Sequence, residues 1–251
     1  MVHFVGAGCG APDLITVRGA RLLAEADVVI YAGSLVNPEL LKCCRDGCEM
    51  HDSARLTLEE VVGIICEAEA RGKTCVRLHT GDPSLYGAVR EQFDALDHLG
   101  VAYDVCPGVS AFCGAAASLK AELTLPEVSQ TVIIARAEGK TSVPERESLR
   151  SLASHGCTMA LYLSAGLTDK VQAELIAGGY APDTPAAIVY KASWPEEKRI
   201  PCRLGDLAET AREHGVSKTA LILVGDFLGD QYERSKLYDP AFSTGYREAR
   251  L

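Results

Sequence analysis

The sequence lacks a hydrophobic run that could cross a membrane, the features of a signal peptide in its first residues, and an excess of basic residues. No apolar stretch approaches the roughly 20 residues that a membrane-spanning helix requires. The first five residues, MVHFV, lack the basic start and long apolar stretch of a signal peptide and instead indicate a first buried strand. We therefore expect a cytoplasmic protein that is not bound to a membrane.

Basic residues are outnumbered by acidic ones. Lys and Arg total 25, Asp and Glu total 34, and the formal net charge is −9. Non-specific nucleic-acid binding depends on neutralising phosphates with Lys and Arg, so we expect no nucleic-acid partner. An acidic small-molecule substrate is still compatible with this charge, because a local cluster of Arg and Lys can oppose the sign of the whole molecule.

The ten cysteines lack the paired spacing of a zinc site. No two of them form a Cys-x-x-Cys pair. Cys44 and Cys48 are four residues apart, but no second pair or histidine cluster completes a ligand set. We expect structural or free thiols in a reducing interior, and no metal site made by the protein.

The chain does contain a clear alternation of short apolar runs and amphipathic helical stretches, which is typical of an α/β protein. Thr57 is a good N-cap, with Glu60 three positions on and apolar residues at helical spacing behind it. The strands expected from this pattern are 3–6, 27–31, 74–79, 102–106, 130–135, 158–163, 186–191 and 219–224. The expected helices are 16–25, 57–70, 86–99, 110–119, 148–154, 167–177 and 204–214.

A turn-rich segment near Pro126 separates two sets of elements, and the small-residue helix 110–119 stands between them. We predict an N-terminal α/β domain over 1–114 and a C-terminal α/β domain over 115–230. The stretch 231–251 has no clear periodicity, and we expect it to be a loosely attached extension.

Three glycine-bearing loops follow expected strands, and ligands of open α/β sheets bind where such loops converge. In the first, the glycines fall at positions 6, 8 and 10, and Pro12 stands where a dinucleotide-binding helix would begin. The G-x-G-x-x-G fingerprint is therefore not met, and a pyrophosphate cradle is disfavoured. A turn that lets a ligand or a neighbouring loop approach closely is compatible with the same residues.

The other two loops are Thr80-Gly81-Asp82-Pro83 and Pro107-Gly108-Val109-Ser110-Ala111. Each has an ordinary interpretation: Asp82 suits a turn closed by its own side chain, and Ser110 suits the cap of a helix that begins at Ala111. The Asp82 carboxylate has a second candidate role, as a hydrogen-bond acceptor for a ligand. Taken singly, neither loop indicates a binding site.

Together, however, the three loops resemble the tetrapyrrole methylase family. The similarity continues through 122–126, 161–164, 189–195 and 220–225, so it covers about residues 2–228 in order. Within that family, 26–36 and 136–141 are similar to the cobalt-precorrin-4 methyltransferases, which act at ring carbon 11 on the anaerobic route to vitamin B12. Cys9 is a departure, because family members often have proline there.

The resemblance implies a two-domain tetrapyrrole methylase fold that binds S-adenosylmethionine (SAM) in the inter-domain cleft, and it implies a homodimer. It also implies a tetrapyrrole substrate, cobalt-precorrin-4, with the cobalt belonging to that substrate. Carried over motif by motif, the residues expected to line the cofactor are Pro12, Gly81, Asp82, Pro83, Ser110, Ala111, Leu163, Ala192 and Ala220.

The substrate's acetate and propionate groups suit Arg and Lys, which form charge-assisted hydrogen bonds with carboxylates. Our candidates are Arg136, Lys140 and Lys191, with Tyr86 as a further polar group, whereas no catalytic base is assigned. We expect His79 to be a hydrogen-bonded core histidine, and we favour packing over substrate contact for Trp194. The alternatives are a metal-free precorrin-4 or another precorrin or uroporphyrinogen as substrate, or a SAM-binding regulatory module without turnover.

Overall fold

The computed structural model describes residues 1–250, and these form two compact units. The first unit is Met1–Ala115 together with the short segment Ala192–Pro195. The second is Ala116–Lys191 together with the described residues from Glu196 onward. The chain therefore leaves the second unit for four residues and returns to it.

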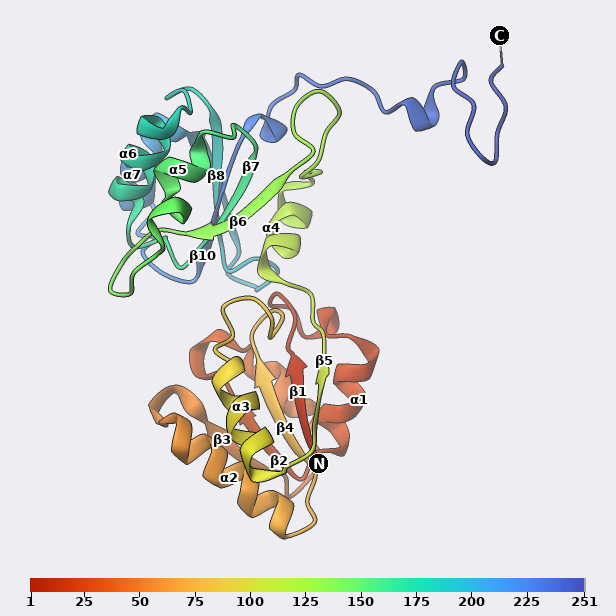
Figure 1. The fold of residues 1–251 in the computed structure, drawn as a ribbon, viewed down its shortest axis with the longest axis vertical. Helices are drawn as coiled ribbons and strands as arrows, with labels where there is room; N and C mark the ends of the chain where they lie inside the picture. The colour runs from red at the N-terminus through yellow and green to blue at the C-terminus, as the bar shows by residue number, and fades with distance from the viewer. Residues whose placement is uncertain (251) are drawn as a thin grey trace. The chain divides into compact units, whose positions relative to one another are not determined.

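The first unit is a parallel sheet in the order β3-β2-β4-β1-β5 (Figure 1). Every strand pair in it is parallel, so all five carboxyl ends lie at one edge. Its elements are β1 (Val2–Gly6), α1 (Val17–Glu25), β2 (Val28–Tyr31), β3 (Glu49–Asp52), α2 (Leu58–Ala70), β4 (Cys75–His79), α3 (Arg90–Leu99) and β5 (Tyr103–Cys106). The helix α4 (Ala111–Leu119) follows and runs into the second unit.

Helices cover both faces of this sheet, because alternate residues of each strand point to opposite sides. Val5, Val29 and Val76 pack in the cluster that contains the buried leucines of α1. Phe4 and Ile30 pack instead in the cluster built with α2 and α3. The two apolar layers explain why these strands read as nearly continuous hydrophobic runs.

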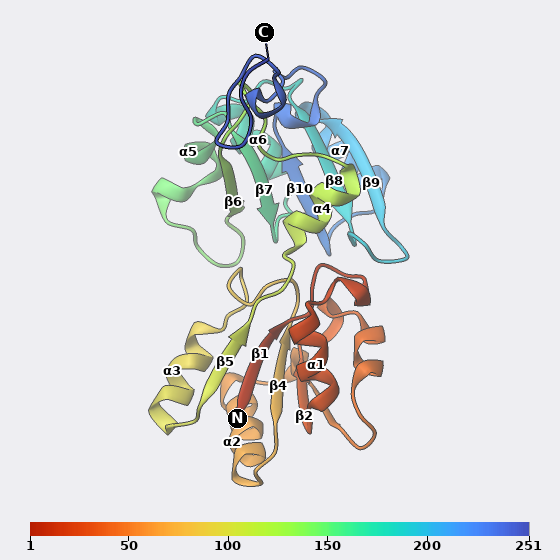
Figure 2. The ribbon, with the colours of Figure 1, turned by 90° about the vertical axis from the view of Figure 1, so that its right-hand side faces the viewer.

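The second unit is a mixed sheet in the order β6-β7-β10-β8-β9 (Figure 2). The pair β6·β7 is parallel, and the remaining neighbours are antiparallel. Its elements are β6 (Val132–Arg136), α5 (Leu149–Ala153), β7 (Thr158–Tyr162), α6 (Thr168–Gly178), β8 (Pro185–Tyr190), β9 (Lys198–Arg203), α7 (Leu207–Glu213) and β10 (Ala220–Val224).

The sequence pattern missed β3 and β9 and began α3 too early. Half of the residues of β3 are exposed, and β9 is an edge strand that carries charges and Pro201. Helix α3 begins at Arg90 rather than at 86 because Tyr86 and Ala88 have φ of 55° and 47°, which a right-handed helix excludes. The capping box predicted at Thr57 and Glu60 is confirmed.

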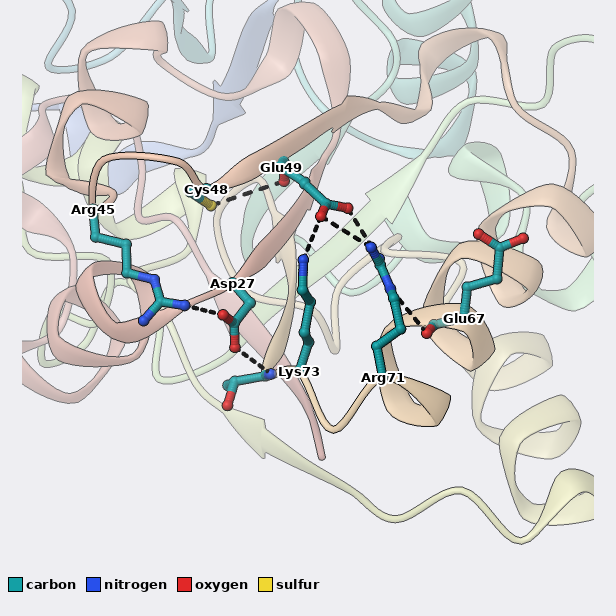
Figure 3. A network of polar contacts seen from close by, with 8 residues as sticks. Asp27, Arg45, Cys48, Glu49, Glu67, Arg71 and Lys73 are labelled. Atoms are coloured by element: carbon teal, nitrogen blue, oxygen red, sulfur yellow. Dashed lines mark hydrogen bonds and ion pairs between the residues drawn. The ribbon is translucent and has the colours of Figure 1, made fainter.

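Ion pairs and hydrogen bonds between charged side chains connect the amino ends of the strands of the first sheet (Figure 3). Glu49, at the start of β3, pairs with Arg71 after α2 and with Lys73 before β4. Hydrogen bonds from Arg71 and Lys73 lower the pKa of Glu49 to about 2. Asp27 pairs with Arg45 and accepts the Thr74 amide at 2.8 Å. This network fixes where β2, β3 and β4 begin.

The C-terminal segment is held by its own contacts. The Arg247 guanidinium donates to the carbonyls of Leu237, Asp239 and Phe242, and the Arg250 amide donates to Pro240 at 2.7 Å.

No helix among residues 1–250 is long and apolar enough to span a membrane.

Candidate functional site

The three glycine-bearing loops of the first unit lie together at the carboxyl edge of its sheet. Gly6, at the end of β1, pairs in register with His79, at the end of β4. The pairing continues beyond the strands: the Ala7 amide donates to the His79 carbonyl at 2.7 Å, and Gly8 and Gly81 exchange two hydrogen bonds of 3.2 and 2.9 Å. The first and second loops are therefore one hydrogen-bonded structure.

The third loop is in direct backbone contact with both of the others. A Cβ atom added to Gly6 would lie 2.6 Å from Gly108 Cα and from the Gly81 carbonyl oxygen. One added to Gly108 would lie 2.2 Å from that same oxygen. These distances are too short for real atoms, so both positions require glycine and the three backbones meet directly.

Asp82 joins the second loop to the third with its side chain. Its Oδ2 accepts the Gly108 amide at 2.8 Å, and its Oδ1 accepts the amide of Ser84 at 2.8 Å and the Ser84 hydroxyl. Partial burial acts to raise the pKa of Asp82, but the hydrogen bonds from Ser84 and Gly108 outweigh it and leave the pKa lowered. Of the two roles predicted for Asp82, the structure displays the loop-holding one.

Other predicted cofactor residues of the first unit surround this junction. Ser110 is buried and lies next to Gly81, where a Cβ would be 3.6 Å from Ser110 Cα and from the Ala111 amide nitrogen. Pro12 begins a short 3-10 helix in the first loop. Ala192 is buried and its carbonyl oxygen lies against Gly10.

Leu163 and Ala220 belong to the second unit, as do Arg136 and Lys191, and all of them lie at one edge of its sheet. Arg136 stands opposite Tyr162, which Leu163 follows, and Ala220 stands opposite Tyr190, which Lys191 follows. Leu163 and Lys191 have φ of 53° and 47°. Strained backbone of this kind clusters at functional sites, which marks this edge as a second candidate region.

The predicted substrate residues differ in what their side chains do. Arg136 donates to the carbonyls of Ala137, Thr141 and Ser142, so its guanidinium organises the loop that follows β6. Lys140 lies on that loop and is exposed. Lys191 pairs with Glu196 at 3.6 Å. Tyr86, in the first unit, is 44% exposed.

His79 corrects one expectation. It is buried, as predicted, and stacks on Phe4 at 5.9 Å between ring centroids. Its Nε2, however, has no hydrogen-bond partner in the part of the chain that the structure describes. Burial, with a smaller contribution from the Arg77 charge, lowers the pKa of His79 to about 3. This imidazole is therefore neutral at pH 7.

Sequence reasoning missed two side chains that hold the first loop. Asn37 is buried and donates to the Gly10 carbonyl at 3.0 Å. Ser193 accepts the Ala11 amide at 2.9 Å. In the sequence, Asn37 stands before a proline and has the pattern of a helix cap. That local pattern does not indicate its hydrogen bond to Gly10, which is 27 residues away. Trp194 packs against Gly10. In residues 1–250 no group of three or more His, Cys, Asp and Glu is arranged to hold a metal ion.

Comparisons with known proteins identify the family of the chain. The model of the Tetrapyrrole (Corrin/Porphyrin) Methylases matches residues 1–208. The chain is 52% identical to a cobalt-precorrin-4 C(11)-methyltransferase of Methanocaldococcus jannaschii, over 99% of this chain and 96% of that protein. The chain belongs to the tetrapyrrole methylase family, as the sequence motifs predicted.

Two solved structures place the fold in the same family. A cobalt precorrin-4 methyltransferase of cobalamin biosynthesis superimposes with a TM-score of 0.89 and 48% identity, covering 91% of this chain and 96% of the other. A uroporphyrin-III C-methyl transferase of Thermus thermophilus, complexed with S-adenyl homocysteine, superimposes with a TM-score of 0.76 and 30% identity, covering 90% of this chain and 98% of the other. The predicted two-domain α/β fold is confirmed.

Proposed function

We propose that the chain is a SAM-dependent methyltransferase that methylates carbon 11 of cobalt-precorrin-4 on the anaerobic route to cobalamin. The observation that carries this proposal is the junction of Gly6, Gly81 and Gly108, where three loops meet through backbone at the carboxyl edge of a parallel sheet. That arrangement suits a polar ligand held by main-chain groups. The nearly full-length similarity to a named cobalt-precorrin-4 C(11)-methyltransferase supports the particular substrate.

SAM fits the residues at this junction. Glycine, alanine, serine and proline side chains are small, so the backbone can approach a ligand closely and offer its amides and carbonyls. Pro12, Gly81, Asp82, Pro83, Ser110, Ala111 and Ala192 would contribute from the first unit, and Leu163 and Ala220 from the second. When bound, SAM supplies an electrophilic methyl group on a sulfonium.

The protein's part in the reaction is alignment and exclusion of water. In-line transfer of that methyl group would require these residues to align it with the acceptor carbon of the ring and to exclude water; S-adenosylhomocysteine would leave and the macrocycle would lose a proton. Lys140 and Lys191 would bind carboxylates of the substrate, and Arg136 would hold the loop that carries Lys140. No residue is assigned to accept the proton.

The test is an incubation with ¹³C-methyl SAM and either cobalt-precorrin-4 or metal-free precorrin-4, followed by mass spectrometry and NMR of the product. We expect one labelled methyl group at carbon 11 and faster turnover of the cobalt-containing substrate. Label at another ring position, or no label although SAM is bound, would contradict the assignment. Faster turnover of metal-free precorrin-4 would assign the chain to the aerobic reaction instead.

We further infer a homodimer in the cytoplasm. Support for both is indirect: the family resemblance implies a dimer, and a biosynthetic enzyme with ten free cysteines suits a reducing compartment. Sedimentation velocity at micromolar concentration tests the first point, and a single species at the monomer mass of 26.8 kDa would contradict it.

A further inference from the structure

A four-residue segment from the second half of the sequence is built into the first unit, next to the first glycine loop. The segment is Ala192–Pro195, and it lies between β8 and β9 in the chain. A Cβ added to Gly10 would lie 2.4 Å from the Ala192 carbonyl oxygen, 2.7 Å from Ser193 Oγ and 2.3 Å from Trp194 Cδ1. Any residue other than glycine at position 10 would clash with this segment.

Two side chains then hold both polar groups of a single peptide. The Gly10 carbonyl accepts from Asn37 Nδ2 at 3.0 Å, and the Ala11 amide donates to Ser193 Oγ at 2.9 Å. That carbonyl and that amide belong to the same peptide unit, which joins Gly10 to Ala11. The plane of this peptide therefore cannot rotate without breaking a hydrogen bond on each side.

Both side chains are themselves held in place. Asn37 is 6% exposed, and its Oδ1 accepts the Glu39 amide at 3.0 Å, so the side-chain amide has a fixed orientation. Ser193 has a φ of 63°, a conformation that non-glycine residues rarely adopt. Backbone strain of this kind persists where the surrounding structure requires a particular geometry.

We propose that Asn37 and Ser193 are positioning residues that fix the Gly10–Ala11 peptide, and with it Pro12, for binding of SAM. The inference rests on the proposed function, because it takes this loop as part of the cofactor site. A loop already fixed in its bound shape loses little conformational entropy when the ligand binds, so affinity rises without any direct contact. The ring of Pro12 fixes the φ of that residue and restricts Ala11 before it.

Two variants test this proposal in the full-length chain. Ser193→Ala removes the acceptor for the Ala11 amide. Asn37→Asp keeps the oxygen that accepts the Glu39 amide but replaces the donor to Gly10 with a second oxygen. We expect each to weaken binding of S-adenosylhomocysteine, measured by calorimetry, about tenfold, the loss typical of a buried hydrogen bond left unmade.

A matched control exists in the C-terminal segment. Ser243 Oγ accepts the Ala249 amide at 2.9 Å, the same kind of bond at the same distance as that of Ser193. Ser243→Ala should bind the ligand within twofold of wild type. In kinetics, the KM for SAM should rise in the two test variants while the KM for the tetrapyrrole stays constant, a split that general destabilisation would not produce.

Hydrogen exchange at the Ala11 amide separates this inference from the proposed function, because it needs no ligand. We expect faster exchange there in Ser193→Ala, and unchanged exchange in Ser243→Ala. Wild-type affinity and wild-type Ala11 exchange in both folded test variants would overturn the inference. Wild-type protein that binds no S-adenosylhomocysteine would overturn the proposed function instead. If Ser193→Ala fails to fold, Asn37→Asp still supplies the comparison of ligand affinity, and wild-type affinity in that variant would overturn the inference.

Discussion

Asp82 is the residue whose side chain joins two of the three loops. One of its carboxylate oxygens accepts from Ser84 and the other accepts from Gly108. In Asp82→Asn one oxygen can still serve Ser84, but the amide nitrogen would face the Gly108 amide, donor against donor. We expect a loss of about 1–3 kcal/mol in unfolding free energy and weaker S-adenosylhomocysteine binding. Urea denaturation and calorimetry measure the two effects.

Asp239→Asn is the control for this substitution. Asp239 also accepts a backbone amide at 2.8 Å, from Ala241, but it does so in the C-terminal segment. Equal effects of the two substitutions on ligand affinity would remove Asp82 from the proposed site.

His79 makes the first unit sensitive to acid. Its pKa is about 3 in the folded chain, against an ordinary 6.5, so the folded state holds it neutral while the unfolded state takes up a proton. Stability from this group is complete above pH 6.5 and is lost as the pH falls toward 3. Between pH 6.5 and 5 the loss is about 2 kcal/mol.

Urea midpoints at the two pH values measure this loss. His79→Leu should show a smaller decline in that interval than wild type, and His98→Leu, at an exposed position of α3, should decline as wild type does. An equal decline in His79→Leu and wild type would show that another group is responsible.

At the scale of elements, the site depends on three strands ending at the same level with no side chain between their loops. Gly6→Ala would place a methyl group against Gly108 and the Gly81 carbonyl. We expect it to destabilise the protein by about 1–3 kcal/mol and to weaken ligand binding.

Gly63→Ala is the matched substitution, because a Cβ on Gly63 in α2 meets nothing within 4 Å. There the change should raise stability by about 0.5–1 kcal/mol, since alanine is the better helix former. Thermal denaturation of both variants gives the comparison, and a tolerated alanine at position 6 would mean that the loops are not in direct backbone contact.

Strands such as β4 and β10 were predicted because they are nearly continuous apolar runs that are buried on both faces, and the half-exposed β5 still followed the pattern. β3 and β9 escaped prediction because charges and exposed residues interrupt them. The start of α3 was misplaced because the left-handed conformations of Tyr86 and Ala88 depend on the loop around them, and no glycine marks either position.

At the scale of the whole molecule, the order of motifs along the chain predicted the family, and the parallel topology of the first sheet explains why its three glycine-bearing loops share an edge. Long-range contacts were beyond prediction. Asn37 and Ser193 lie 27 and 182 residues away from their partners, and local sequence gives no signal for such bonds. For Arg136 the sequence shows only the charge, so the hydrogen bonds that its guanidinium donates to the nearby Thr141 and Ser142 carbonyls were not predicted either.

Hydrogen–deuterium exchange with and without S-adenosylhomocysteine tests the cofactor assignment of the three loops most directly. We expect slower exchange on binding in 6–13, 80–84 and 107–111, with 45–49 and 71–73 unchanged, because the latter lie at the opposite edge of the same sheet. Unchanged exchange in all three loops, under conditions where calorimetry shows the ligand bound, would contradict the assignment.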